Sequence, residues 1–251
     1  MDRKDSMTGV LRRIKKIWKT LLDILYPRRC PVCDGILPFG GDLVCPECEK
    51  RILPVREPRC RKCGKMLRDE TAEYCRDCRK IRHSFDRGFS AFLYNDTMQG
   101  SIFRFKYKGR REYADYYSRE IADKLGRDLS SFRADALVPI PLYKKKQRDR
   151  GFNQAEVLAR AIGDRVGIPV YPHLLTRVRA TRPQKTLSLA ERRKNLKRAF
   201  KISQNVVELT NVILVDDIYT SGCTMDEAAD VLKEAGVKGV YALTLCSGVP
   251  I

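Results

Sequence analysis

The sequence predicts an α/β fold with a mainly parallel, doubly wound sheet and a small cysteine-rich module at the N-terminus. Strand-like and helix-like segments alternate from residue 85 onward, the order expected of a parallel sheet with helices on both faces. The run Val212–Val215 is apolar at every position, as in a strand buried on both sides. Eight of the ten cysteines lie between Cys30 and Cys78, so the module and the sheet occupy different parts of the chain.

Residues 1–29 predict a basic amphipathic helix. Apolar residues follow helical spacing from Val10 to Leu25, and the opposite face carries five cations, Arg12, Arg13, Lys15, Lys16 and Lys19. These charges interrupt the apolar run, so the segment predicts neither a secretory signal nor a transmembrane helix. Docking on the next domain is the first interpretation of this helix, and peripheral contact with a membrane surface is the alternative.

Residues 30–80 predict a double zinc ribbon. Four CxxC pairs recur every fifteen residues: Cys30/Cys33, Cys45/Cys48, Cys60/Cys63 and Cys75/Cys78. Two such pairs supply the four thiolates of one tetrahedral site, so the module predicts two structural Zn2+ sites. Sequential pairing is the simplest assignment, and interleaved pairing stays open. The lack of a secretory signal favours reduced thiols and a cytoplasmic location.

Residues 81–251 predict the α/β domain itself. Strands are predicted over 87–95, 136–142, 168–171, 212–215 and 239–246, and helices over 98–109, 112–126, 153–167 and 224–236. Two connections are predicted to be loops. The first, Lys144–Arg150, is strongly basic, and the second, residues 173–187, has the length of a lid over a binding site.

The strand at 212–215 ends in the most informative motif of the chain. Two carboxylates, Asp216 and Asp217, are followed by Thr220, Ser221, Gly222, Cys223 and Thr224. Thr224 and Glu227 have capping-box spacing, so a helix is expected to start here. Successive N–H groups, hydroxyls and a helix N-terminus bind phosphate, whereas the carboxylates suit a ribose diol or a hydrated metal ion. A sugar phosphate satisfies both, and the sequence contains neither the P-loop nor the dinucleotide-binding pattern.

The segment "VILVDDIYTSGCT" resembles the signature by which type I phosphoribosyltransferases bind 5-phosphoribosyl-1-pyrophosphate (PRPP). Together with "VPIPLYKKKQRDRGFNQAEVLARAI", "RPQKTLSLAERRKNLKRAF" and the CxxC pairs, it resembles the ComF (ComFC, competence protein F) family over roughly Leu21 to Gly248. The resemblance implies a type I phosphoribosyltransferase-like fold that binds PRPP with Mg2+ through Asp216, Asp217 and the loop Thr220–Thr224.

The same resemblance implies roles for the two basic connections. The first would be a pyrophosphate loop acting through Lys144, Arg148, Arg150 and Asn153. The second would close over PRPP, with Arg182 and Lys185 as tentative catalytic residues that stabilise the departing pyrophosphate. A solvated basic loop is the other interpretation of Lys144–Arg150, and only the pyrophosphate interpretation requires Arg150 to point inward.

Charge and resemblance together predict anionic partners. Fifty Lys and Arg against 31 Asp and Glu give a formal net charge of +19, which favours nucleic acid, an anionic membrane surface or polyphosphates. The resemblance implies natural transformation, in which the protein binds PRPP, handles incoming single-stranded DNA and works with the DNA-uptake machinery. The alternative is a salvage or biosynthetic phosphoribosyltransferase with an unidentified acceptor. The expected DNA contact is the basic stretch Arg177–Arg198. Candidates for stacking on the bases are Tyr107, Tyr113, Tyr116 and Tyr117, although core packing explains most of these tyrosines equally well.

Overall fold

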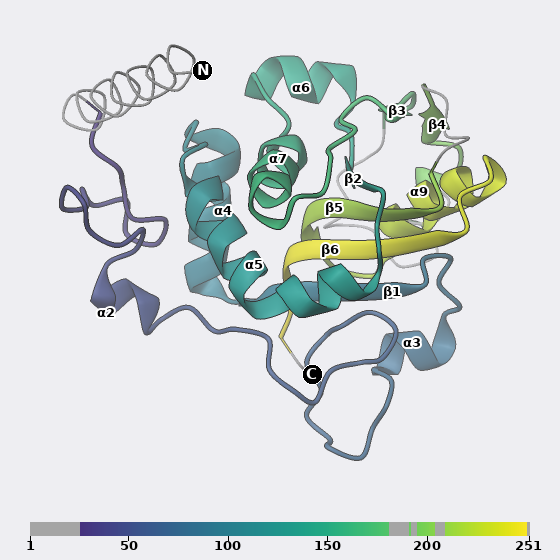
Figure 1. Ribbon diagram of the computed structural model, residues 1–251, viewed down its shortest axis with the longest axis horizontal. Helices are drawn as coiled ribbons and strands as arrows, with labels where there is room; N and C mark the ends of the chain where they lie inside the picture. The colour runs from purple at the N-terminus through teal and green to yellow at the C-terminus, as the bar shows by residue number, and fades with distance from the viewer. Residues whose placement is uncertain (1–25, 181–190, 192–194, 204–208, 250–251) are drawn as a thin grey trace, which may run out of the picture.

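A four-stranded parallel sheet forms the centre of the protein, as shown in the computed structural model in Figure 1. The structure describes residues 26–180, 191, 195–203 and 209–249. The strand order is β1-β6-β5-β2, with bounds β1 Arg87–Tyr94, β2 Ala136–Pro139, β5 Asn211–Tyr219 and β6 Gly239–Gly248. Every pairing in this sheet is parallel, so the predicted sheet is confirmed. The predicted strand 168–171 is reduced to a single bridge between Val170 and Leu137.

Helices cover both faces of the sheet, because β5 is apolar on both sides. Ile213 and Val215 pack into one core cluster, and Val212 and Leu214 pack into the other. The first face carries α4 Asp96–Tyr107, α5 Tyr113–Ser131 and α7 Gln154–Val166, whereas α9 Cys223–Glu234 lies on the second. The described residues hold no helix with the length and apolar character that a membrane crossing requires.

Two segments predicted to be loops contain regular structure. Lys144–Arg150 forms the short helix α6, which ends at Gly151 in the left-handed conformation. Leu175–Arg177 forms β3, which pairs antiparallel with β4, Phe200–Ile202. Leu174 and Leu175 are buried, so this part of the predicted lid belongs to the core on the α9 face.

The cysteine-rich module wraps around the β1 edge of the sheet. Its first half, with α2 Pro46–Glu49, packs into the core on the α4 and α5 face, and its second half, with α3 Arg76–Lys80, packs into the core on the α9 face. The segment between the halves pairs with β1: the Val55 N–H donates to the Ala91 carbonyl at 2.9 Å, and the Leu93 N–H donates to the Leu53 carbonyl at 2.8 Å. The module thereby protects an edge that would otherwise be open to pairing with another chain.

The predicted boundaries at residues 29/30 and 80/81 stay predictions. Most of the N-terminal helix predicted for residues 1–29 lies outside the described residues, which begin at Tyr26. Residues 30–80 share both core clusters and backbone hydrogen bonds with the sheet. Because the halves of the module contact opposite faces, each depends on the sheet for burial of its apolar residues.

Candidate functional site

The two adjacent carboxylates at the end of β5 lie close enough to interact with each other, but their other partners differ. Asp217 contacts Lys106 of α4 and Gln154 of α7. Asp216 lies within reach of the positive charge of Arg177 in β3. The sequence suggested one pair of equivalent acids, and the structure gives them different surroundings.

Asp217 is held in a buried ion pair. Its side chain is 5% exposed and contacts the Lys106 ammonium of α4, while the Gln154 amide of α7 donates to its Oδ1 at 3.3 Å. Burial opposes ionisation of Asp217, but the charge of Lys106 outweighs it and lowers the pKa of this carboxyl below its usual range. Asp217 is thus a carboxylate that stays charged inside the protein.

Asp216 is half-buried and has weaker compensation. The backbone N–H of Asp217 donates to its Oδ1 at 2.8 Å, and the positive charge of Arg177 in β3 acts on it from the α9 side. Burial, and then the neighbouring charge of Asp217, raise the pKa of Asp216 well above its usual range. A ligand that brings hydroxyl donors or a cation would lower the cost of this charge.

The predicted phosphate loop connects β5 to α9. Thr220 is exposed, Ser221 is half-buried, and Gly222 has φ +81°, a left-handed conformation that favours glycine. The predicted capping box is wrong, because α9 begins at Cys223 with Gly222 as N-cap, and the Glu227 carboxylate accepts from the Arg198 N–H. Cys223 is buried, and its Sγ lies 3.2 Å from Ser221 Oγ.

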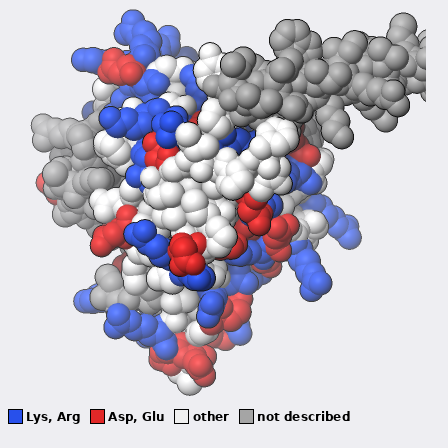
Figure 2. Space-filling model, turned by 90° about the vertical axis from the view of Figure 1, so that its left-hand side faces the viewer, with Lys and Arg blue, Asp and Glu red and all other residues white. Residues whose placement is uncertain are grey.

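Cations from three elements converge on this edge of the sheet. Partial burial, and then the positive charges of Arg177, Arg150 and Lys106, lower the pKa of Lys146. A group that titrates this way lies among like charges, which is the environment an anionic ligand neutralises. In Figure 2, Lys and Arg gather at the top of the molecule, at the height of α6 in Figure 1.

Arg150 points inward from the end of α6. It is half-buried, donates to the Gln154 Oε1 and lies 4.8 Å from the Tyr107 ring centroid, whereas Lys144 and Arg148 are exposed. Arg150, Gln154, Asp217 and Lys106 therefore form a continuous polar chain from α6 to α4. The inward orientation is the one that the pyrophosphate interpretation requires.

Asn153, predicted for the pyrophosphate loop, lies within the described structure, whereas the predicted catalytic residues do not. Asn153 is the N-cap of α7: its Oδ1 accepts from the Ala155 N–H at 3.1 Å, and its Nδ2 donates to the Ile140 carbonyl at 3.1 Å. Both ends of this side chain are engaged within the protein, so it holds the loop in place. Arg182 and Lys185 lie outside the described residues.

The tyrosines considered as DNA contacts differ in solvent exposure. Tyr113, Tyr116 and Tyr117 are fully buried and form part of the core, so the core-packing alternative holds for them and they are not stacking surfaces. Tyr107 is 60% exposed, beside Arg150 at the end of α4. Only tertiary packing separates the three core tyrosines from the one at the surface.

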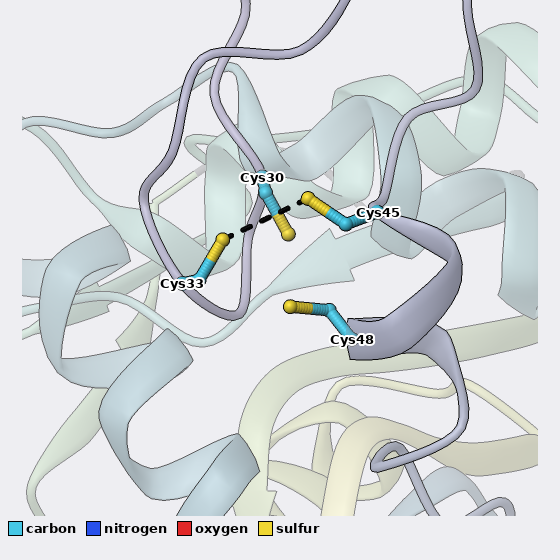
Figure 3. Close-up of side chains that lie close together, drawn as sticks. All are labelled: Cys30, Cys33, Cys45 and Cys48. Atoms are coloured by element: carbon cyan, nitrogen blue, oxygen red, sulfur yellow. Dashed lines mark hydrogen bonds between the residues drawn. The ribbon is translucent and has the colours of Figure 1, made fainter.

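The first four cysteines converge from two loops. Figure 3 shows the sulfurs of Cys30, Cys33, Cys45 and Cys48 pointing toward one centre, with Cys48 on α2. The four sulfurs lie within 4.8 Å of one another, and Cys33 Sγ is 3.7 Å from Cys45 Sγ. A tetrahedron with Zn–S bonds of about 2.3 Å has sulfurs roughly 3.8 Å apart, so the cluster fits zinc.

The other four cysteines of the module form an equivalent cluster. Cys60, Cys63, Cys75 and Cys78 also lie within 4.8 Å, and Cys63 Sγ is 3.7 Å from Cys75 Sγ. Pairing is therefore sequential, and the interleaved alternative is wrong. Four thiolates fill a tetrahedral zinc site and leave no position for a substrate, so both centres are structural.

Comparison with known families agrees with this architecture. Residues 21–79 match the family described as a double zinc ribbon domain, and residues 149–249 match the family described as a phosphoribosyl transferase domain. The second match includes α6 from Asp149 onward, β5, the loop at 220–222 and α9. The type I phosphoribosyltransferase-like fold with an N-terminal zinc-ribbon module is therefore confirmed.

Relatives extend over most of the chain. It is 32% identical over 218 residues to competence protein F of Haemophilus influenzae, covering 84% of this chain and 93% of the relative. The chain belongs to the ComF family. Competence protein ComFC of Streptococcus pneumoniae is 29% identical over 217 residues, covering 86% of each chain. The DNA utilization protein YhgH of Escherichia coli is 30% identical over 156 residues, covering 61% of this chain and 68% of the relative.

One solved structure similar to this ComF protein is the glutamine PRPP amidotransferase of Bacillus subtilis in complex with ADP and GMP. The TM-score is 0.38 at 19% identity, with 57% of this chain and 30% of that chain covered.

The sequence did not reveal the partners of the acid pair. Lys106 lies in a segment predicted only as helix, more than one hundred residues before Asp217. Gln154 lies in the segment "VPIPLYKKKQRDRGFNQAEVLARAI", but the family resemblance implied no role for it. A lysine on the buried side of a helix was the available signal, since an uncompensated buried ammonium is costly. Its partner could be identified only once α4 was placed against the end of β5.

Proposed function

We propose that this ComF protein binds PRPP with Mg2+ at the carboxyl edge of its sheet. The observation that supports this most is the convergence of Lys106, Lys146, Arg150 and Arg177 around the end of β5. Ligands of open α/β sheets bind at the carboxyl ends of the strands, and a polyphosphate would neutralise this group of cations. The match to a phosphoribosyl transferase domain over the same segment supports the choice of PRPP.

Each part of the ligand has a chemically suited partner in this proposal. The backbone and hydroxyls of Thr220–Thr224, at the N-terminus of α9, would receive the 5-phosphate. Asp216 would accept from the ribose hydroxyls and is the carboxylate available to Mg2+, which prefers oxygen ligands. The basic residues of α6 would face the pyrophosphate. Asp217 would hold Lys106 and Gln154 in place beneath the ligand.

Membership of the ComF family supports a cellular role in natural transformation. We propose that the protein handles incoming single-stranded DNA in the cytoplasm. Its charge of +19 and the basic stretch Arg177–Arg198 provide the electrostatic attraction that binding without sequence preference requires. The DNA-uptake machinery would then be its protein partner.

Asp216→Asn is expected to weaken binding of Mg2+-PRPP by roughly 10- to 100-fold, because hydrogen bonds to a charged acceptor contribute about 1.5 to 3 kcal/mol each. Isothermal calorimetry with Mg2+-PRPP measures the loss. Asp164→Asn removes an exposed carboxylate from α7 and should leave affinity unchanged. Equal affinity of the wild type and Asp216→Asn would rule out this assignment of the diol partner.

Single-stranded DNA should bind with an affinity that falls steeply with salt. Each neutralised phosphate contributes about 0.7 to the slope of log affinity against log salt, so contact with about four phosphates gives a slope near −3. Fluorescent oligonucleotides titrated at several salt concentrations give this slope. Arg179→Glu with Lys197→Glu, two exposed positions of the basic stretch, should make it shallower by about 1.4, again at about 0.7 per contact.

Lys238→Glu is the matched control for this titration. Lys238 is exposed at the opposite edge of the sheet, directly before the amino end of β6, and should leave the slope unchanged. Absence of binding at low salt, or a slope near zero in the wild type, would remove DNA handling from the proposal.

A phosphoribosyltransferase acting on an unidentified acceptor is the second candidate, supported by the domain match over residues 149–249. Pyrophosphate release from PRPP in the presence of a panel of nucleobases separates it from a protein that only binds PRPP. Turnover that depends on one base would favour the enzyme, and binding without turnover would favour the DNA-handling role.

A further inference from the structure

A buried histidine lies directly beneath the predicted phosphate loop. His83 belongs to the segment that leads from α3 to β1, and its ring stacks on Phe85 with centroids 4.9 Å apart. Its Nδ1 lies 2.9 Å from the Asp226 carboxylate in the first turn of α9, and its Nε2 lies 3.4 Å from the hydroxyl of Tyr219, the last residue of β5. One side chain therefore contacts both elements that the loop connects.

The loop backbone at Gly222 is in close contact with the imidazole of His83. A Cβ added at Gly222 would lie 2.6 Å from the Tyr219 hydroxyl and 2.7 Å from His83 Cε1, distances that no side chain tolerates. Gly222 also has φ +81°, so glycine is required there both by its conformation and by the close approach. The position of the imidazole thus limits where the N–H groups of the loop can lie.

Residues of the second zinc centre pack against Tyr219, the other partner of His83. Lys65, which lies between the two CxxC pairs of that centre, has its ammonium 5.4 Å from the centroid of the Tyr219 ring. Cys60, Cys63, Phe85, Tyr219 and Cys223 belong to one buried cluster. The Ser84 N–H also donates to Asp226 at 2.9 Å, which fixes the backbone beside His83 to α9.

We propose that His83 is a positioning residue that transmits the rigidity of the second zinc ribbon to the phosphate loop. It contacts no ligand: it is buried, and it acts by fixing Gly222 and the first turn of α9. That the loop receives the 5-phosphate of PRPP rests on the proposed function. That His83 orders the loop does not depend on it.

The test combines hydrogen exchange with ligand binding. His83→Leu keeps similar bulk but loses both polar contacts, and it should accelerate exchange in residues 218–226 while both zinc ions remain bound. Affinity for Mg2+-PRPP should fall about tenfold if the loop then holds its binding conformation about a tenth of the time. His83→Asn can still donate to Asp226 and should restore both exchange and affinity to within about threefold of wild type, because it retains the contact to α9.

Two further variants make the outcome decisive. His173→Leu changes the exposed histidine and should alter neither measurement. Asp226→Ala removes the same contact from α9 and serves as the test if His83→Leu loses zinc or fails to fold. Wild-type exchange over residues 218–226 in a zinc-loaded His83→Leu or Asp226→Ala protein would overturn the inference. If exchange over residues 218–226 is faster in these variants but the wild-type protein does not bind PRPP, the inference about His83 is supported and PRPP is rejected as the ligand.

Discussion

Replacing Cys60 and Cys63 together by serine is expected to remove one of two zinc ions per chain and to unfold the second half of the cysteine-rich module. Both side chains are buried, and a tetrahedral site does not survive the loss of two of its four sulfurs. A structural zinc site contributes on the order of 10 kcal/mol to ordering such a module, which makes this the largest effect we expect. The loss of structure should extend to the edge of the sheet, because residues beside these cysteines pack against the start of β1.

Metal analysis of protein prepared without chelator gives the stoichiometry, which should be two for the wild type and one for the variant. Hydrogen exchange should increase over residues 58–80 and at Gly88, whose N–H donates to the Lys62 carbonyl at 2.7 Å. Cys223→Ser alters a buried cysteine outside both clusters and should keep both ions. A wild-type content of one zinc or none would contradict the two-site arrangement.

Lys106→Met is expected to destabilise the fold by about 3 to 5 kcal/mol, because removing one partner of a buried ion pair leaves the other charge uncompensated. The Asp217 side chain is almost completely buried, and Gln154 also donates a hydrogen bond to it. Urea unfolding followed by circular dichroism measures the change. Lys124→Met replaces a more exposed lysine of α5 whose partner is Glu120 one turn away, and should cost less than about 1 kcal/mol.

This destabilisation should depend on pH. In the wild type, the lowered pKa of Asp217 contributes stability that is present above the unfolded value of about 4 and is lost as pH falls through the folded pKa. Without Lys106, burial would raise the pKa of Asp217, so the deficit should be largest near neutral pH and shrink as the carboxyl protonates. Adding Asp217→Asn to Lys106→Met should recover part of the loss at pH 7. A deficit independent of pH would indicate lost packing as its source.

The sequence by itself determined the features that depend on local spacing. The CxxC repeat predicted two four-cysteine centres, since two cysteines with two residues between them already present two ligands to one metal. The apolar run of β5 predicted a strand buried on both faces, and the alternation of strands with helices predicted the parallel sheet. The ComF resemblance came from the order of its motifs along the chain.

Only the tertiary structure decided which side chains meet across long stretches of sequence. The partners of Asp216 and Asp217 depend on which elements pack beside the end of β5, so no signal in the sequence linked Lys106 and Arg177 to these acids. No signal in the sequence linked His83 to Gly222, and only the fold brings the two residues into contact. Local spacing constrains contacts within about one turn or one strand, whereas contacts between elements depend on how the two buried faces of the sheet are covered.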